Sequence, residues 1–238
     1  MKQTLSENVR TTYVRSMFNA IAKNYDFLNH LLSAGIDIWW RKKAMQLLFN
    51  YHPKKILDVA CGTGDLSITV AEKISPQEII GVDIAEEMLH IGRKKIVTKN
   101  LQHIIRMENG NAENLQFEGH YFDAAIVAFG VRNFTHLEKG LNEMRRILKE
   151  NGTILILEFS QPQIFPFRQL YFFYFTNILP LIGKIFSQHD EAYHYLPNTV
   201  MNFPDGERFI SILKNIGFKN PIATPLTFGI ATIYIAQK

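Results

Sequence analysis

The chain has 238 residues, of which 47% are apolar and 20% charged, and a formal net charge of +4. This length and composition suit one α/β domain with a sizeable core and exclude a disordered chain. The single cysteine excludes an internal disulfide framework, and the dispersed Lys and Arg residues form no basic stripe for nucleic acid. Residues 1–7 contain no apolar core of signal-peptide length, so a cytoplasmic protein is expected.

Residues 1–52 are predicted to form a helical cap ahead of the main fold. Apolar residues recur at four-residue spacing in a first helix over residues 9–25, and this helix is placed to cover a substrate pocket. Residues 24–29 then interrupt the pattern. A second helix is expected to start at Asp37, as its N-cap, and to stop at His52 and Pro53, with Trp39 and Trp40 packed in the core.

One glycine turn organises the rest of the chain. A short apolar run, residues 56–60, leads into Gly62 and Gly64, and an apolar-periodic segment follows at once. This is the pattern of a buried strand that turns tightly into a helix. Glycine adopts positive φ and has no Cβ, so a ligand can lie against the backbone and reach N–H groups at the helix start. Cys61 lies inside this turn, where a small buried residue explains it as well as a nucleophile does.

The charges beside this turn distinguish between two classes of cofactor. A dinucleotide fingerprint requires a third glycine or alanine where this chain has Ser67. Asp58 and Asp65 flank the turn, and carboxylates about 4 Å from a pyrophosphate would cost roughly several kcal/mol at an effective dielectric near 20. The same carboxylates suit a cation. S-adenosylmethionine carries an ammonium and a sulfonium but no phosphate, so it is the predicted cofactor.

Two further segments support a nucleoside site. A second apolar run, residues 78–83, ends in Asp83, roughly 20 positions past the glycines, which is the spacing of a ribose-binding carboxylate at the tip of the second strand. The loop over residues 109–113 offers Asn111 and Ala112 to an adenine ring, although a plain turn explains it equally well. A lone Gly-x-Gly pair is weak evidence for a nucleotide site. The carboxylates of Asp58, Asp65 and Asp83, at these spacings from the glycines, strengthen the prediction of an S-adenosylmethionine site.

Strands and helices alternate through the rest of the chain. Helices are expected over residues 85–97, 135–149 and 205–216, and strands over residues 103–107, 121–128, 152–159, 218–223 and 226–236. With the two strands already described, this predicts one Rossmann-like α/β domain over residues 1–238, with a seven-stranded, mostly parallel sheet and helices on both faces. Its cofactor-binding core is residues 53–160, and its last helix and strands are residues 204–238.

An apolar insertion, residues 161–203, separates the fifth strand from the last helix. Its uncharged part, residues 170–183, is shorter than the ~20 residues that span a bilayer and contains Pro180, so we do not expect it to cross a membrane. A buried lid is the default interpretation. A groove for a lipid tail and a contact with a membrane surface are the alternatives, and the last would make the protein peripheral on the inner face of the cell membrane.

Several short motifs lie outside the glycine turn. They are Asn24-Tyr25-Asp26, Asn111-Ala112-Glu113, Phe129-Gly130-Val131-Arg132-Asn133, Glu158-Phe159-Ser160-Gln161-Pro162, Tyr193-Tyr195-Leu196 and Phe203-Pro204. On these motifs the chain resembles the menaquinone and ubiquinone biosynthesis C-methyltransferase family, nearly from end to end. The resemblance implies a class I S-adenosylmethionine-dependent methyltransferase that converts demethylmenaquinol, a prenylated quinol, into menaquinol. The alternative substrate is a ubiquinone-pathway benzoquinol or another apolar phenol.

The resemblance also implies which residues touch the cofactor. They are Thr63, Asp83, Asn111 and Ala112. Many family members have serine where this chain has Ala128, so one side-chain hydrogen bond to the cofactor would be absent.

The same interpretation suggests catalytic roles. Methyl transfer is an in-line displacement, with a ring carbon held roughly 3 Å from the methyl group. A quinol carbon becomes more nucleophilic as the ring hydroxyl loses its proton, so a cation beside that oxygen lowers the barrier. Arg132 is the candidate to stabilise the phenolate and Asn133 to orient the hydroxyl. Tyr25 and Asp26 would close the pocket or relay a proton. A plain helix-start turn is the other explanation of Arg132 and Asn133.

Other classes of function stay open at this point. They are a dinucleotide-binding oxidoreductase, a non-catalytic S-adenosylmethionine-binding module, and a methyltransferase that acts on a soluble phenol or a sterol-like ring. No cluster of His, Cys and Asp has the spacing of metal ligands, so no metal is expected. A homo-oligomer is possible.

Overall fold

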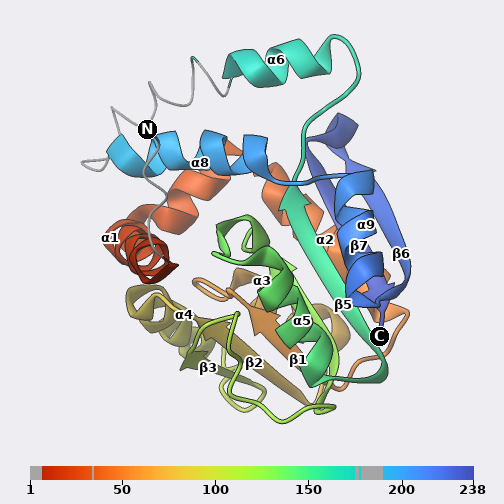
Figure 1. The fold of residues 1–238 in the computed structure, drawn as a ribbon. Coiled ribbons are helices and arrows are strands. Elements are labelled where there is room, and N and C mark those ends of the chain that lie inside the picture. The colour runs from red at the N-terminus through yellow and green to blue at the C-terminus, as the bar shows by residue number, and fades with distance from the viewer. Residues whose placement is uncertain (1–6, 34, 175–176, 178–189) are drawn as a thin grey trace.

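The computed structural model describes residues 7–33, 35–174, 177 and 190–238 of the chain. Two helices, α1 (Glu7–Leu32) and α2 (Ile36–Phe49), precede the first strand (Figure 1). The strands are β1 (Lys55–Val59), β2 (Glu78–Asp83), β3 (Ile105–Asn109), β4 (Phe122–Ala128), β5 (Leu148–Phe159), β6 (Lys219–Leu226) and β7 (Ala231–Gln237). The other helices are α3 (Asp65–Ile74), α4 (Glu86–Thr98), η1 (Val131–Asn133), α5 (Leu137–Ile147), α6 (Phe167–Phe173), α8 (Asp190–Asn202), α9 (Glu207–Ile216) and η3 (Thr227–Gly229).

In the described part of the chain the strands form one seven-stranded sheet, in the order β3-β2-β1-β4-β5-β7-β6. β7 runs antiparallel to both of its neighbours, and the other pairs are parallel. The predicted seven-stranded, mostly parallel sheet is therefore confirmed. The strand order reverses between β1 and β4, and ligands bind parallel sheets in the crevice beyond the carboxyl ends of strands at such a point.

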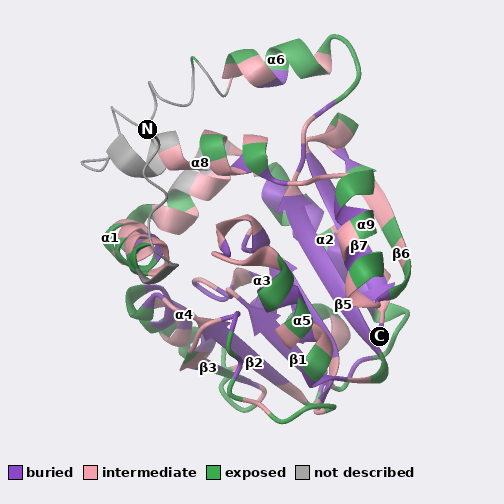
Figure 2. Cartoon of the chain, in the orientation of Figure 1, coloured by how far each residue is buried: buried purple, intermediate pink, exposed green. Residues whose placement is uncertain are grey.

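Helices cover both faces of this sheet. Side chains alternate between the faces with the period of two that a pleated strand imposes. Leu57 and Val59 of β1 pack in a cluster with α5 and α9, whereas Ile56 belongs to the cluster on the other face, with α2, α3 and α4. Neither cluster includes a residue of α1 that the structure describes. Figure 2 shows the same contrast, with buried strands and a largely exposed or half-buried α1.

The first helix is longer than the sequence predicts. It runs on to Leu32, so the break expected at residues 24–29 is wrong. That stretch contains no Pro or Gly, and its polar side chains find partners without leaving the helix. Asp26, for example, pairs with Lys95 and accepts a hydrogen bond from Thr63.

The start of α2 also differs from the prediction. The helix begins at Ile36, one residue before the predicted N-cap, and Gly35 precedes it with φ 76°. Asp37 lies inside the first turn, where it accepts a hydrogen bond from Ser33 and pairs with Arg41. The prediction that Asp37 is the N-cap is therefore wrong, because a glycine with positive φ makes the corner instead.

The two tryptophans of α2 have different environments. Trp40 is buried, and its Nε1 donates a hydrogen bond to Thr227 at 2.8 Å, so its predicted core position is confirmed. Trp39 is 52% exposed, so the same prediction is wrong for it. Neighbouring helix residues point about 100° apart, and both rings cannot face one sheet.

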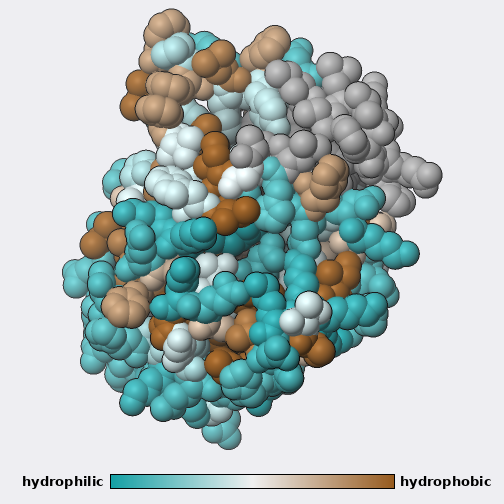
Figure 3. Space-filling model, turned by 180° about the vertical axis from the view of Figure 1, so that it is seen from behind, coloured by the Kyte–Doolittle hydropathy of each residue, from teal (hydrophilic) through white to brown (hydrophobic). Residues whose placement is uncertain are grey.

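The apolar insertion contains α6 and α8. Residues 175–176 and 178–183 of its uncharged part lie outside the described residues. No helix among the residues that the structure describes is long and apolar enough to span a bilayer. Tyr171 of α6 is buried, but Leu170 and Phe173 are 60% and 58% exposed. A buried lid therefore does not account for the outer face of α6, which carries the apolar side chains at the upper left of Figure 3.

Candidate functional site

A pocket lies in the crevice at the carboxyl ends of the strands. Its empty volume, including the open mouth, is about 690 Å³, within the usual size of small-molecule sites. Residues that follow β1, β2, β3 and β4 line one side, and one face of α1 lines the other. The strand-end residues include Ala60, Gly62, Asp83, Asn111, Ala112, Phe129 and Asn133, and α1 supplies Thr11, Val14, Phe18 and Tyr25.

The backbone at the mouth of the pocket adopts positive φ at several positions. Gly62 and Gly64 have φ of 55° and 80°, angles that glycine takes without a steric penalty. Ala60 and Phe129 also have positive φ, 52° and 57°, although both carry a Cβ. Both line the pocket at the ends of β1 and β4. Strained backbone of this kind clusters at ligand sites.

Asp83 lies at the tip of β2 and lines the pocket. One carboxylate oxygen accepts the N–H of Gly62 at 2.9 Å and the other accepts the N–H of Ala85 at 2.8 Å. Burial raises the pKa of Asp83, and the N–H groups of Ala85, Gly62 and Ile84 oppose that shift. A carboxylate has about four lone-pair positions, so both oxygens keep capacity for hydroxyl donors. The backbone bonds fix its direction.

Asp58, one of the predicted cofactor residues, does not line the pocket. It is buried, and Ser67 donates a hydrogen bond to its Oδ2 at 2.6 Å. Its Oδ1 has no hydrogen-bond partner among the described residues. Burial raises its pKa to about 7, against the bond from Ser67. The pKa of the Cys61 thiol is also raised, mainly by burial and next by the negative charge of Asp58. A raised pKa argues against a thiolate nucleophile.

Replacing Asp58 by asparagine is expected to change how stability depends on pH. The unfolded carboxyl loses its proton near pH 4, whereas the folded one keeps it to about pH 7. The folded state therefore holds an extra proton in this window, and the free energy of unfolding falls by roughly 1.4 kcal/mol per pH unit as pH rises. D58N removes this term, so its stability relative to the wild type should increase between pH 5 and pH 7 in urea unfolding.

Asp123 supplies the control for this measurement. It accepts the N–H groups of Lys54 and Lys55. Partial burial opposes ionisation, but the side-chain bond from Lys149, followed by these backbone bonds, lowers the pKa of Asp123. Both its folded and unfolded forms are ionised above pH 5. D123N should therefore shift the whole stability curve by a constant amount over the same range, and a D58N curve parallel to that of the wild type would contradict the assignment of a neutral Asp58.

The other predicted residues of the glycine turn have partners outside the pocket. Thr63 is buried and donates from Oγ1 to Asp26 at 2.5 Å. Gly64 precedes α3 as its N-cap. Asp65, which the charge argument places beside the ligand, pairs with Lys95 at 2.6 Å. Of the seven cofactor residues predicted from the sequence, the pocket therefore brings together Gly62 with Asp83, Asn111 and Ala112.

The loop after β3 is both a turn and a wall of the pocket. Asn111 Oδ1 accepts the N–H of Glu113 at 2.9 Å, and the small Ala112 between them is buried. Glu113 was not singled out as a site residue by its sequence context. Its buried carboxylate accepts the N–H groups of Thr135 and His136 at 2.6 and 3.2 Å, so it joins this loop to the start of α5.

Arg132 lies behind the pocket wall in a buried ion pair. Its Nη1 is 2.7 Å from Glu158 Oε1 and also donates to the carbonyl of Phe129, and its backbone N–H donates to Glu158 at 3.3 Å. The guanidinium lies 5.3 Å from the centre of the Phe159 ring. Burial raises the pKa of Glu158, and Arg132 is the largest opposing influence. The Nε of Arg132 is buried without a hydrogen-bond partner in the described structure.

Of the four predicted catalytic residues, Asn133 and Tyr25 line the pocket. Asn133 Oδ1 is buried and has no partner among the described residues. Burial raises the pKa of Tyr25, against the influence of Arg132, so its hydroxyl stays protonated at neutral pH. Asp26 does not line the pocket and is turned to Lys95 and Thr63.

The pocket wall is acidic rather than basic. Asp83 and Glu113 are among its lining residues, and no Lys or Arg appears among the lining residues that the structure describes. A pyrophosphate would find no counter-charge at this wall, whereas a cationic ligand would. In the described ranges no group of three His, Cys, Asp or Glu side chains is arranged to hold a metal ion.

Comparison with solved structures agrees with the fold. An S-adenosylmethionine-dependent methyltransferase of Thermotoga maritima superposes with a TM-score of 0.65 at 19% identity, over 94% of this chain and 99% of that one. A phosphoethanolamine N-methyltransferase of Haemonchus contortus, solved with S-adenosyl-L-methionine, gives a TM-score of 0.61 at 14% identity, over 82% of this chain and 52% of that one. The fold is that of the class I methyltransferases.

Sequence comparison is more specific. A demethylmenaquinone methyltransferase of Bacteroides fragilis is 41% identical over 238 residues, which is 100% of this chain and 97% of that protein. A ubiquinone/menaquinone biosynthesis C-methyltransferase UbiE of Geotalea uraniireducens is 44% identical over 226 residues, covering 94% of this chain and 96% of that protein. The model of the ubiE/COQ5 methyltransferase family matches residues 6–238. The chain therefore belongs to the ubiE/COQ5 methyltransferase family.

Proposed function

We propose that this protein uses S-adenosylmethionine to methylate a ring carbon of demethylmenaquinol, giving menaquinol. The observation that carries the proposal is an aromatic corner with two unsatisfied polar atoms. Phe129 and Phe159 lie 4.6 Å apart there, and Trp40 packs on both. Beside them Arg132 Nε and Asn133 Oδ1 are buried without partners in the described structure. A flat aromatic ring with a hydroxyl group satisfies both features.

The residues beyond the glycine turn fit the cofactor. Asp83 offers both carboxylate oxygens to the ribose hydroxyls, and Gly62 lets the ligand approach the backbone. Asn111 and Ala112 would lie along the adenine ring. Thr63, Gly64 and Asp58 shape the turn from behind, because their contacts are with other parts of the protein. When bound, S-adenosylmethionine supplies a methyl group on a positively charged sulfur.

Arg132 and Asn133 have distinct roles in the proposed mechanism. The ring hydroxyl releases its proton to solvent before the methyl group is transferred, and the Arg132 guanidinium stabilises the negative charge that this leaves on the ring oxygen. The guanidinium is always protonated, so it is not the base. Asn133 accepts the hydrogen bond of the hydroxyl and fixes the ring. Glu158 holds Arg132 in place through its side chain and its backbone. Tyr25 and the α1 wall exclude water from the reacting atoms.

The direct test is methylation in vitro. The protein is supplied with S-adenosylmethionine and a reduced demethylated naphthoquinol, and the quinones are analysed by mass after oxidation. A product heavier by one methylene unit is the expected result. A parallel reaction with a demethylated benzoquinol separates the naphthoquinol substrate from the ubiquinone-pathway alternative. Tight binding of NADH, with none of S-adenosylhomocysteine, would overturn the proposal.

We further infer that the outer face of α6, together with the residues just before this helix, contacts an anionic membrane surface. Ile164, Phe165, Leu170 and Phe173 are 58% to 76% exposed and gather at one end of the molecule (Figure 3). Arg168 lies among them, 5.8 Å from the Phe172 ring, and the chain carries a net charge of +4. Aromatic side chains with flanking cations suit the interface of an anionic bilayer. A prenylated quinol is itself a membrane lipid, so the substrate would be met there.

Leu170→Ser with Phe173→Ser is expected to weaken binding to vesicles of anionic phospholipid at least about tenfold, because each change removes a large apolar side chain from the interface. Sedimentation with vesicles measures the bound fraction. Val97→Ser with Ile222→Ser is the control, since these side chains are 59% and 57% exposed away from α6. Equal losses in both variants would show that binding is not specific to α6.

A further inference from the structure

The ammonium of Lys95 joins three separate elements beside the glycine turn. Its Nζ lies 2.6 Å from Asp26 on α1 and 2.6 Å from Asp65 at the start of α3, and it donates to Thr63 Oγ1 in the turn at 3.0 Å. An ammonium has three protons, and each has an acceptor on a different element. Thr63 Oγ1 in turn donates to Asp26 at 2.5 Å, which closes a ring of hydrogen bonds.

Few side chains of the first helix are fully buried, so polar contacts such as this one help to hold it in place. Val14 and Ala22 are the buried side chains among the α1 residues whose burial the structure describes. Its apolar contact is a small cluster in which Ala22 meets Ala85 and Met88 at the start of α4. Half-buried side chains pack around this cluster, namely Phe18, Ile21, Tyr25 and Ile91. More side chains are buried in α2 and in α5. Polar contacts therefore contribute relatively more to holding α1 against the rest of the protein than they do for those two helices.

The fourth helix comes unusually close to the glycine turn at the same place. Gly92 lies one helical turn before Lys95, and a Cβ on it would be 2.6 Å from the Met107 sulfur and 3.1 Å from the Thr63 carbonyl carbon. The missing Cβ lets α4 pack against the turn. Lys95 then reaches past the turn to α1.

Lys95 thus connects the two sides of the pocket. Thr63 lies beside Gly62 on one side, and Asp26 follows Tyr25 on the other. We propose that Lys95 is a positioning residue that locks α1 over the bound cofactor, by holding Asp26 to the glycine turn. This inference rests on the proposed function, because it takes the pocket as the site of S-adenosylmethionine. Without the lock, α1 opens more often and the cofactor or its product leaves faster.

The charged groups that hold α1 to the glycine turn are partly shielded from solvent, so their interaction can contribute to stability. The side chains of Lys95, Asp26 and Asp65 are each 26% exposed. At the C-cap of the same helix, Lys99 pairs with Glu72 at 2.7 Å, but these side chains are 49% and 46% exposed. Exposed pairs contribute little because water and salt screen them, and partly buried pairs are screened less. Lys99 is therefore a matched control, with the same chemistry one turn away.

The test compares Lys95→Met with Lys99→Met in the full chain. Calorimetry with S-adenosylhomocysteine should show a Kd about tenfold higher for K95M, and stopped-flow measurements should place the change in the dissociation rate. K99M should stay within about twofold of the wild type. Hydrogen exchange of the α1 amides should be faster in K95M alone, because exchange reports local opening.

Asp26→Asn tests the same contact from α1 and leaves the pair of Lys95 with Asp65 in place. The double variant D26N/K95M should bind no more weakly than K95M, since both changes break one contact. If K95M and K99M bind S-adenosylhomocysteine with equal affinity and their α1 amides exchange at equal rates, Lys95 does not lock α1. The proposed function would still stand. A wild-type protein that does not bind S-adenosylhomocysteine at all would remove the proposed function and the lock with it.

Discussion

Replacing Asp83 by asparagine is expected to weaken the binding of S-adenosylhomocysteine about 100-fold. Asp83 lines the pocket, and the N–H groups of Gly62 and Ala85 fix the direction of its carboxylate. In the proposed complex its free lone pairs would accept two ribose hydroxyls. A hydrogen bond to a charged group contributes roughly 1.5–3 kcal/mol, and asparagine loses both the charge and one acceptor oxygen. Two weakened bonds together give a loss of this size, which calorimetry measures directly.

The control must separate the ribose contact from a distorted loop. Like Asp83, Asp123 accepts two backbone N–H groups, those of Lys54 and Lys55, but it does so near the start of β1, at the opposite end of the strand from the pocket. D123N should therefore lower stability and leave the Kd of S-adenosylhomocysteine unchanged. A 2′-deoxyribose analogue of S-adenosylhomocysteine provides a second control. The wild type should bind it more weakly than the parent ligand, whereas D83N should bind both alike. An undiminished preference for the parent ligand in D83N would contradict the ribose contact.

Local sequence patterns predict the sheet and the strand-end residues because these depend on short stretches of chain. The run of apolar residues before Gly62 predicts β1, and the distance from the glycines to Asp83 predicts the tip of β2. Both residues reach the pocket for the same reason, since the carboxyl ends of parallel strands meet at one edge of a sheet. The loop with Asn111 follows the same rule.

Partners of charged side chains depend on tertiary packing, and there the sequence is less informative. The charge argument correctly favours a cation over a phosphate but assigns the acidity to Asp58 and Asp65, whereas Asp83 and Glu113 line the pocket. Lys95 is 30 residues from Asp65, and no local pattern links the two. Glu158 is the last residue but one of the buried strand β5, where an acidic residue without a visible partner is a signal of a buried ion pair.

The buried pair of Glu158 with Arg132 determines how the catalytic proposal can be tested. Removing the guanidinium altogether would leave Glu158 buried without a counter-charge, and such a change destabilises the fold by itself. Arg132→Lys keeps a positive charge for Glu158 but removes Nε, the donor that has no partner in the described structure. The variant therefore separates the proposed contact with the ring oxygen from the structural role of the charge.

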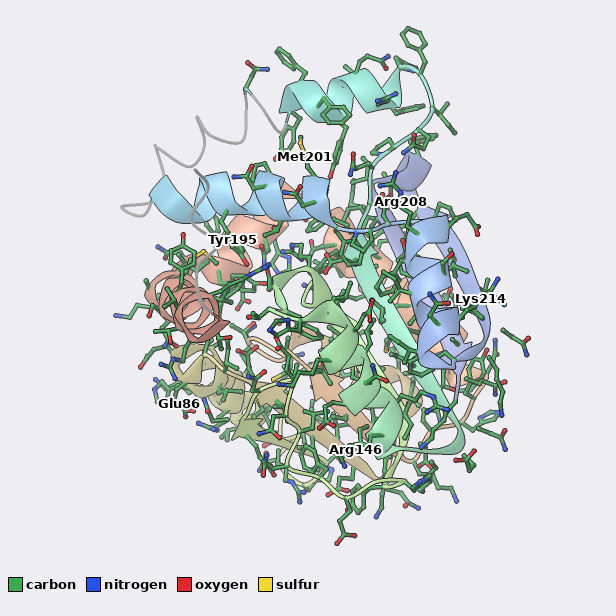
Figure 4. The ribbon with its side chains drawn as sticks, viewed as in Figure 1. Glu86, Arg146, Tyr195, Met201, Arg208 and Lys214 are labelled. Carbon is green, nitrogen blue, oxygen red and sulfur yellow. The ribbon has the colours of Figure 1, made fainter. Side chains whose placement is uncertain are left out.

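Arg132→Lys is expected to lower kcat for methylation roughly 100- to 1,000-fold, the usual loss when one donor to a developing oxyanion is removed. The Kd of S-adenosylhomocysteine should stay within about threefold of the wild type, because Arg132 does not line the cofactor pocket. Arg146→Lys is the control: this arginine pairs with Glu143 on α5, lies at the bottom of Figure 4 and is not among the pocket residues, so the change should leave kcat unchanged. Raising the pH should restore part of the lost rate in R132K, because the ring hydroxyl then ionises without help. A loss of equal size at every pH would mean that Arg132 holds the structure and does not stabilise the phenolate.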